Sequence, residues 1–388
     1  MCIRREFYYH KNFFMKKNIF SKKKRRMCRI LAIGDQHFTT KNIQEIENFI
    51  QEMTKIAVSL KPDIIVLMGD LLHTHEKLHT TPLNKAYEFI RNMRDIALTF
   101  ILVGNHDYIN ASQFLTDNHW LNSMKEWRNV IIVDKIVQHR LLDENNTLLV
   151  FAPYVEPERF VEALDTIEGD WKEASLIFCH QEFFGCNMNG NYVSDKGKWD
   201  LSYPQVIAGH IHTKQHLQKN IYYTGSSMET EWKDSVVNSQ DYNTIALITT
   251  SATDGSHSIE EIEVKLHRKL KIRLAIEDLE SFVIPEVKED TTKIVISGIP
   301  IEEFNTLKKS AKYKELLEKE IKVDFEFNKK EIKVNNEKLQ AIIDDTSLND
   351  FRSIFESIAK QNTDSVYYEI KERVMNDRIV KADNILIL

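Results

Sequence analysis

The sequence predicts an α/β fold built from two sheets that pack against each other. Short apolar runs of strand type alternate with amphipathic segments of helical type, and several of the runs end at a glycine followed by polar side chains. Strands that alternate with helices form parallel βαβ units. A smaller α/β module and a helical C-terminal segment are expected to follow the two sheets.

The first elements are the most regular. A short strand is expected at 29–33, and apolar side chains then recur at helical intervals from Ile43 to Leu60. Lys61 and Pro62 end that helix, because proline cannot continue it. The alternation goes on through a strand at 63–68, a helix at 83–97 and a strand at 99–103.

Beyond residue 130 the expected strands lie closer together, which indicates a second sheet with hairpins. Strands are expected at 130–133, 148–151, 176–179, 205–208, 221–223 and 244–249. The following module shows alternating apolar residues at 262–274, a strand at 293–297, a helix at 301–320 and a strand at 321–327. We therefore expect a basic N-terminal extension at 1–26, a core domain at 27–256, an α/β domain at 257–340 and a helical segment at 341–388.

Composition excludes several classes of protein. The 388 residues are 42% hydrophobic and 28% charged, which rules out a wholly disordered, collagenous or coiled-coil chain. A transmembrane helix would need about eighteen apolar residues in a row, and the sequence contains no such run. The four cysteines show no CxxC pairing, so we expect a reducing, intracellular location, either cytoplasmic or nuclear.

The net charge of −6 hides an uneven distribution. Residues 1–26 carry a net charge of +9, so the remaining 362 residues carry −15. The basic run at 22–26 could be a nuclear address or a nucleic-acid-binding arm. We favour an upstream extension without function, because the regular periodicity begins just after Met27.

Five short segments concentrate side chains that bind metals, and each directly follows an expected strand. In open α/β sheets, ligands bind beyond the carboxyl ends of the strands, so the fold should bring these segments to one edge. They are Gly34-Asp35-Gln36-His37, Gly69-Asp70-Leu71-Leu72-His73, Gly104-Asn105-His106-Asp107, Cys179-His180-Gln181 and Gly209-His210-Ile211-His212.

These residue types suit a pair of divalent cations, which together can hold a hydroxide and neutralise a phosphoryl transition state. Asp70 is the expected bridging carboxylate. The two sets of remaining ligands are expected to be Asp35, His37 and His212 for one ion, and Asn105, His180 and His210 for the other. His106 is expected to reach the substrate, with Asp107 orienting its ring.

The motifs GDQH, GDLLH, GNHD, HQ and GHIH, in this order, resemble those of the calcineurin-like metallophosphoesterase superfamily. The resemblance covers about residues 28–250. It implies an α/β/β/α metallophosphoesterase sandwich with a two-metal centre that uses the ligands named above. Protein Ser/Thr phosphatases differ in the second and third motifs, and lariat-debranching enzymes replace the first aspartate, Asp35 here, with cysteine.

GDLLH, with His73 three residues after Asp70, is similar to the SbcD-type nuclease subunit of DNA double-strand-break repair complexes. This resemblance implies that His73 helps to place the phosphate and that the 257–340 module is a capping domain that binds DNA. It also implies a homodimer assembled with an SMC-like coiled-coil ATPase, docked through the C-terminal helical segment. The expected DNA contacts are Lys265, Arg268, Lys269, Lys271 and Arg273.

The expected function is a metal-dependent DNA phosphodiesterase, a repair exonuclease or endonuclease, in which a hydroxide held between two ions attacks the phosphodiester. The hard ligand set suits Mn²⁺, with Fe²⁺ or Zn²⁺ as alternatives. Two other functions remain open. One is a metallophosphatase or cyclic-nucleotide phosphodiesterase acting on a small substrate, and the other is a non-catalytic scaffold that binds DNA ends.

Overall fold

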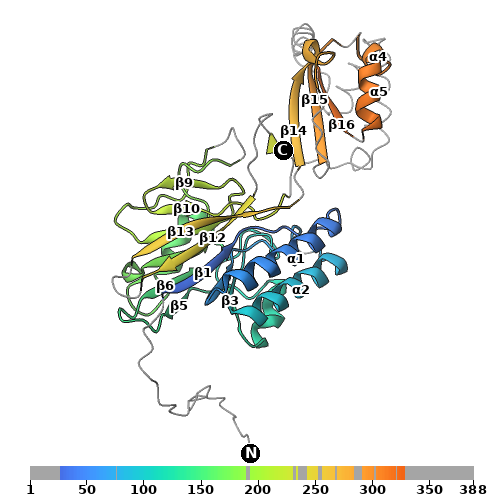
Figure 1. Ribbon diagram of the computed structural model, residues 1–388. Coiled ribbons are helices and arrows are strands. Elements are labelled where there is room, and N and C mark those ends of the chain that lie inside the picture. Colours follow the sequence, from blue (N-terminus) through green and yellow to red (C-terminus); the bar gives the residue numbers. More distant parts are fainter. Residues whose placement is uncertain are drawn as a thin grey trace, which may run out of the picture. The chain divides into compact units, whose positions relative to one another are not determined.

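A computed structural model of the chain (Figure 1) describes residues 27–75, 77–188, 193–229, 233–234, 243–251, 256–266, 269–283, 291–300, 303–319 and 321–327. The N-terminal extension at 1–26, the expected helical segment at 341–388 and Arg268 lie outside these residues. The described residues form two compact units. The larger unit runs to residue 229 and includes 243–266, and the smaller unit contains 233–234 and the residues from 269 onward.

The first sheet of the larger unit has the strand order β13-β12-β1-β2-β3-β4. Strands β1 to β4 are parallel to one another. Strand β12 runs antiparallel to β1, and β13 runs antiparallel to β12. Their bounds are β1 (Cys28–Ile33), β2 (Ile64–Leu67), β3 (Leu98–Leu102), β4 (Val130–Val133), β12 (Asn243–Thr250) and β13 (His257–Val264).

Two long helices, α1 (Ile43–Leu60) and α2 (Thr80–Ile96), connect the first parallel strands and lie side by side on one face of this sheet (Figure 1). The predicted span of the first helix is confirmed. It ends where Lys61 adopts a left-handed conformation with φ of 47° and donates its backbone N–H to the carbonyl of Ala57. Pro62 follows and prevents another turn.

The second sheet has the order β5-β6-β7-β8-β10-β9. The four central strands are parallel, and β5 and β9 add antiparallel hairpin strands at the two edges. Short helices lie before and between these strands. The bounds are η1 (Trp120–Glu126), β5 (Val137–Arg140), β6 (Leu148–Ala152), η2 (Pro157–Arg159), α3 (Phe160–Leu164), η3 (Trp171–Glu173), β7 (Leu176–His180), β8 (Gln205–Gly209), β9 (Gln215–Gln218) and β10 (Ile221–Tyr223).

Alternating side chains build three apolar layers around these two sheets. On β1, Ile30 and Ala32 face the layer between the sheets, and Leu31 and Ile33 face the layer under the helices. A third layer covers the outer face of the second sheet. Phe100 of β3 stacks on Phe151 of β6 with 3.9 Å between ring centroids, which joins the two sheets directly. The predicted α/β fold with two packed sheets is confirmed.

The smaller unit contains a four-stranded sheet of order β11-β14-β15-β16, in which every pairing is parallel. The predicted helix at 301–320 is divided into α4 and α5, because Ser310 breaks it and caps the second helix by accepting from the backbone N–H of Tyr313. The bounds are β11 (Lys233–Asp234), β14 (Lys269–Ala275), η4 (Ile276–Asp278), β15 (Thr291–Ile299), α4 (Phe304–Leu307), α5 (Ala311–Glu318) and β16 (Lys322–Phe327).

The alternating segment at 262–274 belongs to both units. Its first part is β13, which completes the first sheet of the larger unit, and its second part is β14 of the smaller unit. The division between the units therefore falls at about residue 269, not at the expected residue 257. Among the described residues, no helix is long and apolar enough to cross a membrane.

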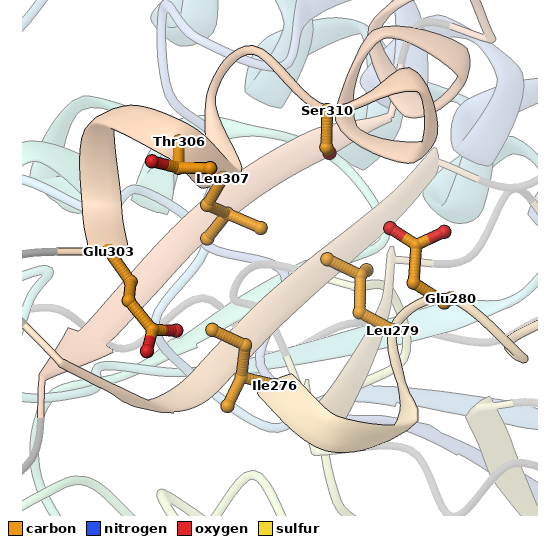
Figure 2. A pocket seen from close by; sticks show the side chains of 7 residues that line it. All are labelled: Ile276, Leu279, Glu280, Glu303, Thr306, Leu307 and Ser310. Carbon is orange, nitrogen blue, oxygen red and sulfur yellow. The ribbon is translucent and has the colours of Figure 1, made fainter.

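A pocket of about 290 Å³ lies in the smaller unit beside η4 and α4 (Figure 2). Its lining combines the apolar side chains of Ile276, Leu279 and Leu307 with the carboxylates of Glu280 and Glu303. This composition differs from that of the polar strand ends in the larger unit, where the expected metal ligands lie.

Candidate metal centre

The five predicted segments follow the carboxyl ends of β1, β2, β3, β7 and β8, and the structure brings them together. The first three strands belong to one sheet and the other two to the second, and all of them are parallel strands within their sheets. Side chains from both sheets therefore meet at a common edge. This arrangement is the one expected from the positions of the segments in the sequence.

One group of ligand side chains consists of Asp35, His37 and His212. One potential ligand atom from each residue lies within 4.8 Å of the others. The Nε2 atoms of His37 and His212 are 2.9 Å apart. Asp35 and His37 are buried, and His212 is half-buried. These three residues are the ones expected to hold the first ion.

A second group consists of Asp70, His180 and His210, whose ligand atoms also lie within 4.8 Å of one another. Asn105 joins this group, because its side-chain oxygen lies 2.9 Å from Nδ1 of His210 and 3.1 Å from Nε2 of His180. His180 Nδ1 lies 2.7 Å from the carbonyl oxygen of Met68. Since a carbonyl can only accept, Nδ1 carries the proton and Nε2 is the nitrogen that can bind a cation.

Asp70 lies between the two groups. Its Oδ2 atom is 3.3 Å from Nε2 of His180 in one group and 3.5 Å from Nε2 of His37 in the other. A single carboxylate oxygen thus faces a histidine of each group, as a bridging ligand would. The Asp and His clusters are consistent with a binuclear metal site.

Two buried side-chain atoms of these residues have no hydrogen-bond partner among the described residues: Oδ2 of Asp35 and Nδ1 of His37. A buried polar atom that lacks a partner costs free energy, so such atoms usually meet a ligand, an ion or water. Aspartate, asparagine and histidine are also the donor set that divalent transition metals accept. The residues present therefore fit a pair of divalent cations.

The electrostatics of the centre also suit added positive charge. Burial raises the pKa of Asp35 to about 7, and repulsion from Asp70 and Asp107 adds to the rise. Burial alone lowers the pKa of His180, but the Asp70 and Asp35 carboxylates outweigh it and raise the value to about 9. Burial likewise lowers the pKa of His210, to about 3. Three buried carboxylates at one edge repel each other, and nearby cations would relieve that repulsion.

The turns that carry the ligands have unusual backbone conformations. His37, Asp70 and His210 have φ values of 48°, 53° and 80°, in the left-handed region that side chains other than glycine seldom adopt. Such strain persists only where the surrounding structure holds it, and it concentrates at functional sites. At Gly104 a Cβ atom would lie 2.2 Å from Oδ1 of Asp70, so this position of the GNHD motif must stay bare.

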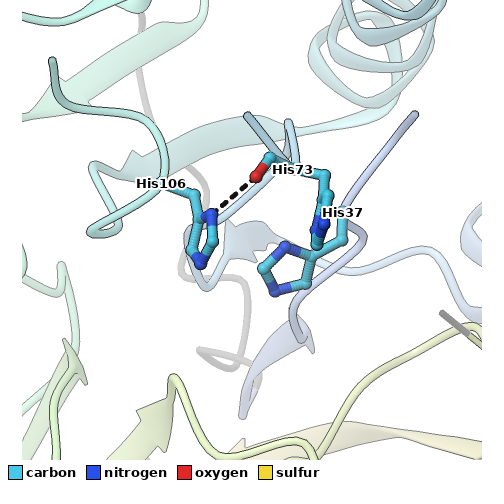
Figure 3. Close-up of side chains that lie close together, drawn as sticks. All are labelled: His37, His73 and His106. Atoms are coloured by element: carbon cyan, nitrogen blue, oxygen red, sulfur yellow. Dashed lines mark hydrogen bonds between the residues drawn. The ribbon is translucent and has the colours of Figure 1, made fainter. Parts of the chain in front are cut away.

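His73 and His106 lie at the mouth of the centre, beside His37 (Figure 3). One ligand atom from each of these three residues falls within 4.8 Å of the others. His106 Nδ1 is 2.6 Å from the carbonyl oxygen of His73. This contact fixes the proton on Nδ1, so Nε2 is the ring nitrogen that can interact with a substrate. His73 is exposed and His106 is half-buried, so both rings can be reached by a substrate.

The expected role of Asp107 in orienting the ring of His106 is wrong. Oδ2 of Asp107 accepts the backbone N–H groups of Gly104 and Asp70, at 3.0 and 2.8 Å. Oδ1 accepts the indole N–H of Trp120 at 2.9 Å. Asp107 therefore joins the turn after β2 to the turn after β3, while the imidazole of His106 bonds to a carbonyl oxygen instead.

Three residues near the centre were not predicted. Trp120 supplies the donor just described, and Tyr154 places its ring 5.5 Å from that of His210. The ring of His75 stacks on that of His106 with 4.7 Å between ring centroids. In the sequence, the only sign that His75 lies near the centre is that it follows His73 by two residues.

Packing around the first ligand turn involves the Gly225-Ser226-Ser227 segment. Ser226 Oγ donates to the carbonyl of Asp35 at 2.6 Å, and the backbone N–H of Ser227 donates to the carbonyl of Gly34 at 3.1 Å. Gly34 lets the segment approach, since a Cβ atom at this position would lie 2.0 Å from the carbonyl oxygen of Gly225. The segment thus positions the backbone that presents Asp35.

The expected DNA contacts are divided between the two units. Lys265 is exposed at the end of the larger unit, whereas Lys269, Lys271 and Arg273 lie on β14 of the smaller one. Arg273 forms an ion pair of 2.7 Å with Glu326 on β16. Arg268 falls outside the part of the chain that the structure describes.

Comparisons with known proteins agree with this centre. A family model described as Calcineurin-like phosphoesterase matches residues 28–214. The chain is 41% identical over 285 residues to "Putative phosphoesterase 244L" of Invertebrate iridescent virus 6, a match that covers 73% of this chain and 98% of that protein. It is also 41% identical over 310 residues to "Putative phosphoesterase 078R" of Invertebrate iridescent virus 3, covering 79% of this chain and 86% of that one.

Among solved structures, the purple acid phosphatase PPD1 from yellow lupin (Lupinus luteus) seeds matches with a TM-score of 0.35 and 12% identity, over 61% of this chain and 54% of that chain. The range that the family model matches contains every residue of the two metal-ligand groups, and both viral relatives align along most of their length. The chain therefore belongs to the calcineurin-like phosphoesterase family, as a metal-dependent phosphoesterase.

Proposed function

We propose that this phosphoesterase is a DNA phosphodiesterase of the SbcD nuclease type that uses two divalent cations, with Mn²⁺ as the preferred metal. The single observation that carries the reaction is the placement of His73 and His106 against His37 at the mouth of the paired metal groups. Residues that only hold metals would not need two further accessible imidazoles there.

Asp35, His37 and His212 would hold one cation, Asn105, His180 and His210 the other, and Asp70 would contact both. When bound, the two cations supply positive charge for the phosphoryl oxygens and lower the pKa of a water molecule that can act as nucleophile. The protein fixes the geometry of these ligands by burying them and by hydrogen bonds such as that from His180 to Met68.

His106 and His73 act on the substrate. His106 donates its Nδ1–H to the carbonyl of His73, which aims its Nε2 away from that bond. In the doubly protonated form, Nε2 of His106 carries a proton that it can give to the leaving oxygen. The exposed imidazole of His73 lies at the same mouth and contributes a hydrogen bond to a phosphoryl oxygen.

A basic sheet face in the smaller unit supports a nucleic-acid substrate. The side chain of Ile272 is buried in the core of this unit, so its neighbours Lys271 and Arg273 point to the opposite face. Lys271 pairs in register with Lys293, and Lys293 with Lys322, so three lysines lie in neighbouring positions across three strands.

Two acidic residues of β16 pair with basic residues on the same face. Asp324 forms an ion pair with Lys293, and Glu326 forms one with Arg273. Within β14, β15 and β16, lysine and arginine outnumber these two acids. Phosphate backbones bind to such surfaces through Lys and Arg with a strong dependence on salt.

The test uses the full-length protein loaded with Mn²⁺, an end-labelled duplex and bis-p-nitrophenyl phosphate. We expect release of nucleotides from the duplex as well as hydrolysis of the small diester. Hydrolysis of the small diester with intact DNA under every metal tried would refute the nuclease and leave a small-substrate phosphodiesterase. DNA binding without hydrolysis of either substrate would instead indicate a non-catalytic scaffold.

A His106→Ala variant tests the role of that residue. We expect turnover to fall by about 10²–10⁴-fold, the range for loss of a general acid, with two metals still bound per chain by elemental analysis. Loss of metal in this variant would show that His106 is a ligand. The control is His79→Ala, because His79 is an exposed histidine outside the groups of potential metal ligands.

The expected partner follows from the same proposal. A homodimer assembled with an SMC-like coiled-coil ATPase would use the segment at 341–388. Removal of residues 347–388 should spare hydrolysis of the small diester and prevent co-purification of the ATPase. Continued co-purification would contradict this assignment of the docking segment.

A further inference from the structure

The ring of His106 is stacked with two other imidazoles. The ring of His75 lies 4.7 Å from that of His106 at an interplanar angle of 12°, and the ring of His73 lies 5.5 Å from it at 15°. All three rings are thus nearly parallel. The His73 and His106 members of this stack are shown in Figure 3.

Two side-chain-to-backbone bonds connect the same segments in opposite directions. His106 Nδ1 lies 2.6 Å from the carbonyl oxygen of His73, and His75 Nδ1 lies 3.3 Å from the carbonyl oxygen of Tyr108. Since carbonyl oxygens only accept, both Nδ1 atoms carry protons. The turn after β2 and the turn after β3 each provide one imidazole and one carbonyl to the other.

Both turns are fixed at their bases. The backbone N–H of His73 donates to the carbonyl of Phe38 at 3.2 Å, and Tyr108 is fully buried. Asp107 accepts from the backbone of Asp70, which joins the two turns below the rings. His75 therefore attaches to a fixed neighbour and stacks on the ring of His106.

We propose that His75 is a positioning residue that holds the imidazole of His106 in its reactive orientation. This proposal rests on the proposed function, in which His106 acts on the leaving group of a phosphodiester. His75 contributes through the stacked ring and the bond to Tyr108. A small displacement of a catalytic group is enough to lower the rate of the chemical step.

The first experiment compares His75→Ala, His75→Phe and the control His79→Ala with bis-p-nitrophenyl phosphate as substrate. We expect His75→Ala to lower kcat by about 3–10-fold, as loss of one ring pair implies, with KM changed by less than about 2-fold. His75→Phe keeps a flat ring in the stack and should recover most of the rate. A normal kcat in His75→Ala, or loss of the two bound metals, would overturn the proposal.

The second experiment is a double-mutant cycle with His106→Ala. If His75 acts through His106, then His75→Ala should cost almost nothing in the His106→Ala background. An equal loss in both backgrounds would show that His75 acts on the substrate itself, and would overturn the positioning role. Bis-p-nitrophenyl phosphate has a leaving group that needs little help from a general acid. The His106→Ala variant should therefore hydrolyse it at a rate that can still be measured.

A third measurement does not depend on turnover. The rate at which diethyl pyrocarbonate modifies His106, followed by peptide mass mapping, should rise several-fold in His75→Ala and return toward the wild-type rate in His75→Phe. An unchanged rate would overturn the proposal even if the wild-type protein had no phosphodiesterase activity. Absence of hydrolysis in the wild-type protein, with this labelling pattern intact, would refute only the proposed function.

Discussion

At the scale of single residues, the site is dominated by buried carboxylates that need positive charge. Asp70 contacts histidines of both ligand groups, and burial raises the pKa of Asp35 to about 7 and that of Asp107 to about 6. These raised values mean that, without cations, folding at neutral pH places charged groups in an unfavourable environment. The stability of the chain should therefore depend on both pH and metal.

The pH dependence has a definite sign. A carboxyl whose pKa is raised on folding binds its proton in the folded state where the unfolded state has lost it, so stability falls as pH rises through that range. For Asp35 the range extends from about 4 to about 7. Protein stripped of metal with a chelator should have a lower Tm at pH 7.5 than at pH 5.5, and Asp35→Asn should reduce this difference. An unchanged difference in that variant would show that other groups cause the effect.

Trp120 provides a second prediction at this scale. In Trp120→Phe, Oδ1 of Asp107 loses its indole donor, so the variant should lose about 1–3 kcal/mol of stability together with part of its activity. Trp127→Phe is a matched control, because both indoles lie 6.1 Å from the ring of Tyr87. Denaturant unfolding of both variants checks the prediction, and an equal loss in the two would argue against the Asp107 contact as the cause.

At the scale of elements, parallel strands deliver the ligands and tight turns aim them. The ligand turns after β1, β2 and β8 each use a left-handed residue, at His37, Asp70 and His210. Glycines beside these turns give the neighbouring backbone room to approach. The strands set which segments meet, and the turns set which atoms face the centre.

Gly104→Ala tests that division of roles. The new methyl group would lie 2.2 Å from Oδ1 of Asp70, so we expect Asp70 to shift and metal affinity to fall by at least about tenfold, within the range for disturbed metal surroundings. Gly298→Ala in the smaller unit is the control. Nothing lies within 4 Å of its added Cβ, and its φ of 77° should cost stability without affecting metal. Isothermal titration with Mn²⁺ would contradict the prediction if both variants bound equally.

At the scale of the whole molecule, the chain combines a metal-binding unit with a smaller unit that presents a basic face. The face of β14, β15 and β16 that points away from the core of the smaller unit carries Lys271, Lys293 and Lys322 in register, outside the ligand groups. If this face binds DNA, its contribution should be separable from hydrolysis itself. Likewise, removal of residues 1–26 should leave catalysis intact.

The double variant Lys271→Gln, Lys322→Gln tests this face. We expect weaker binding to duplex DNA and a shallower dependence of this binding on salt. The slope of the logarithm of the binding constant against the logarithm of the salt concentration should decrease by about 0.9 for each phosphate that the face no longer neutralises. Hydrolysis of bis-p-nitrophenyl phosphate should stay unchanged. Lys55→Gln, on the exposed surface of α1, is the control. Fluorescence anisotropy over a salt series would refute the assignment if the slope matched that of the control.

Much of the fold could be predicted because its signals are local. The helical spacing of apolar residues between Ile43 and Leu60 depends only on neighbouring positions, and the helix forms with those bounds. The edge strands β5 and β9 were missed, because they are short and only partly buried and form through pairing with β6 and β10. The break at Ser310 was also missed, since a serine within a polar helical pattern gives little sign of a cap.

For the site, the sequence by itself predicted which candidate metal ligands come together, because these seven side chains lie at the ends of strands that must meet at one edge of an α/β fold. Only the tertiary structure decided what the side chains around them contact. It placed Trp120 on Asp107, and His75 against His106. The physical reason is that the presence of a strand follows from local periodicity, whereas the direction of a side chain in a turn depends on backbone angles and partners distant in the chain.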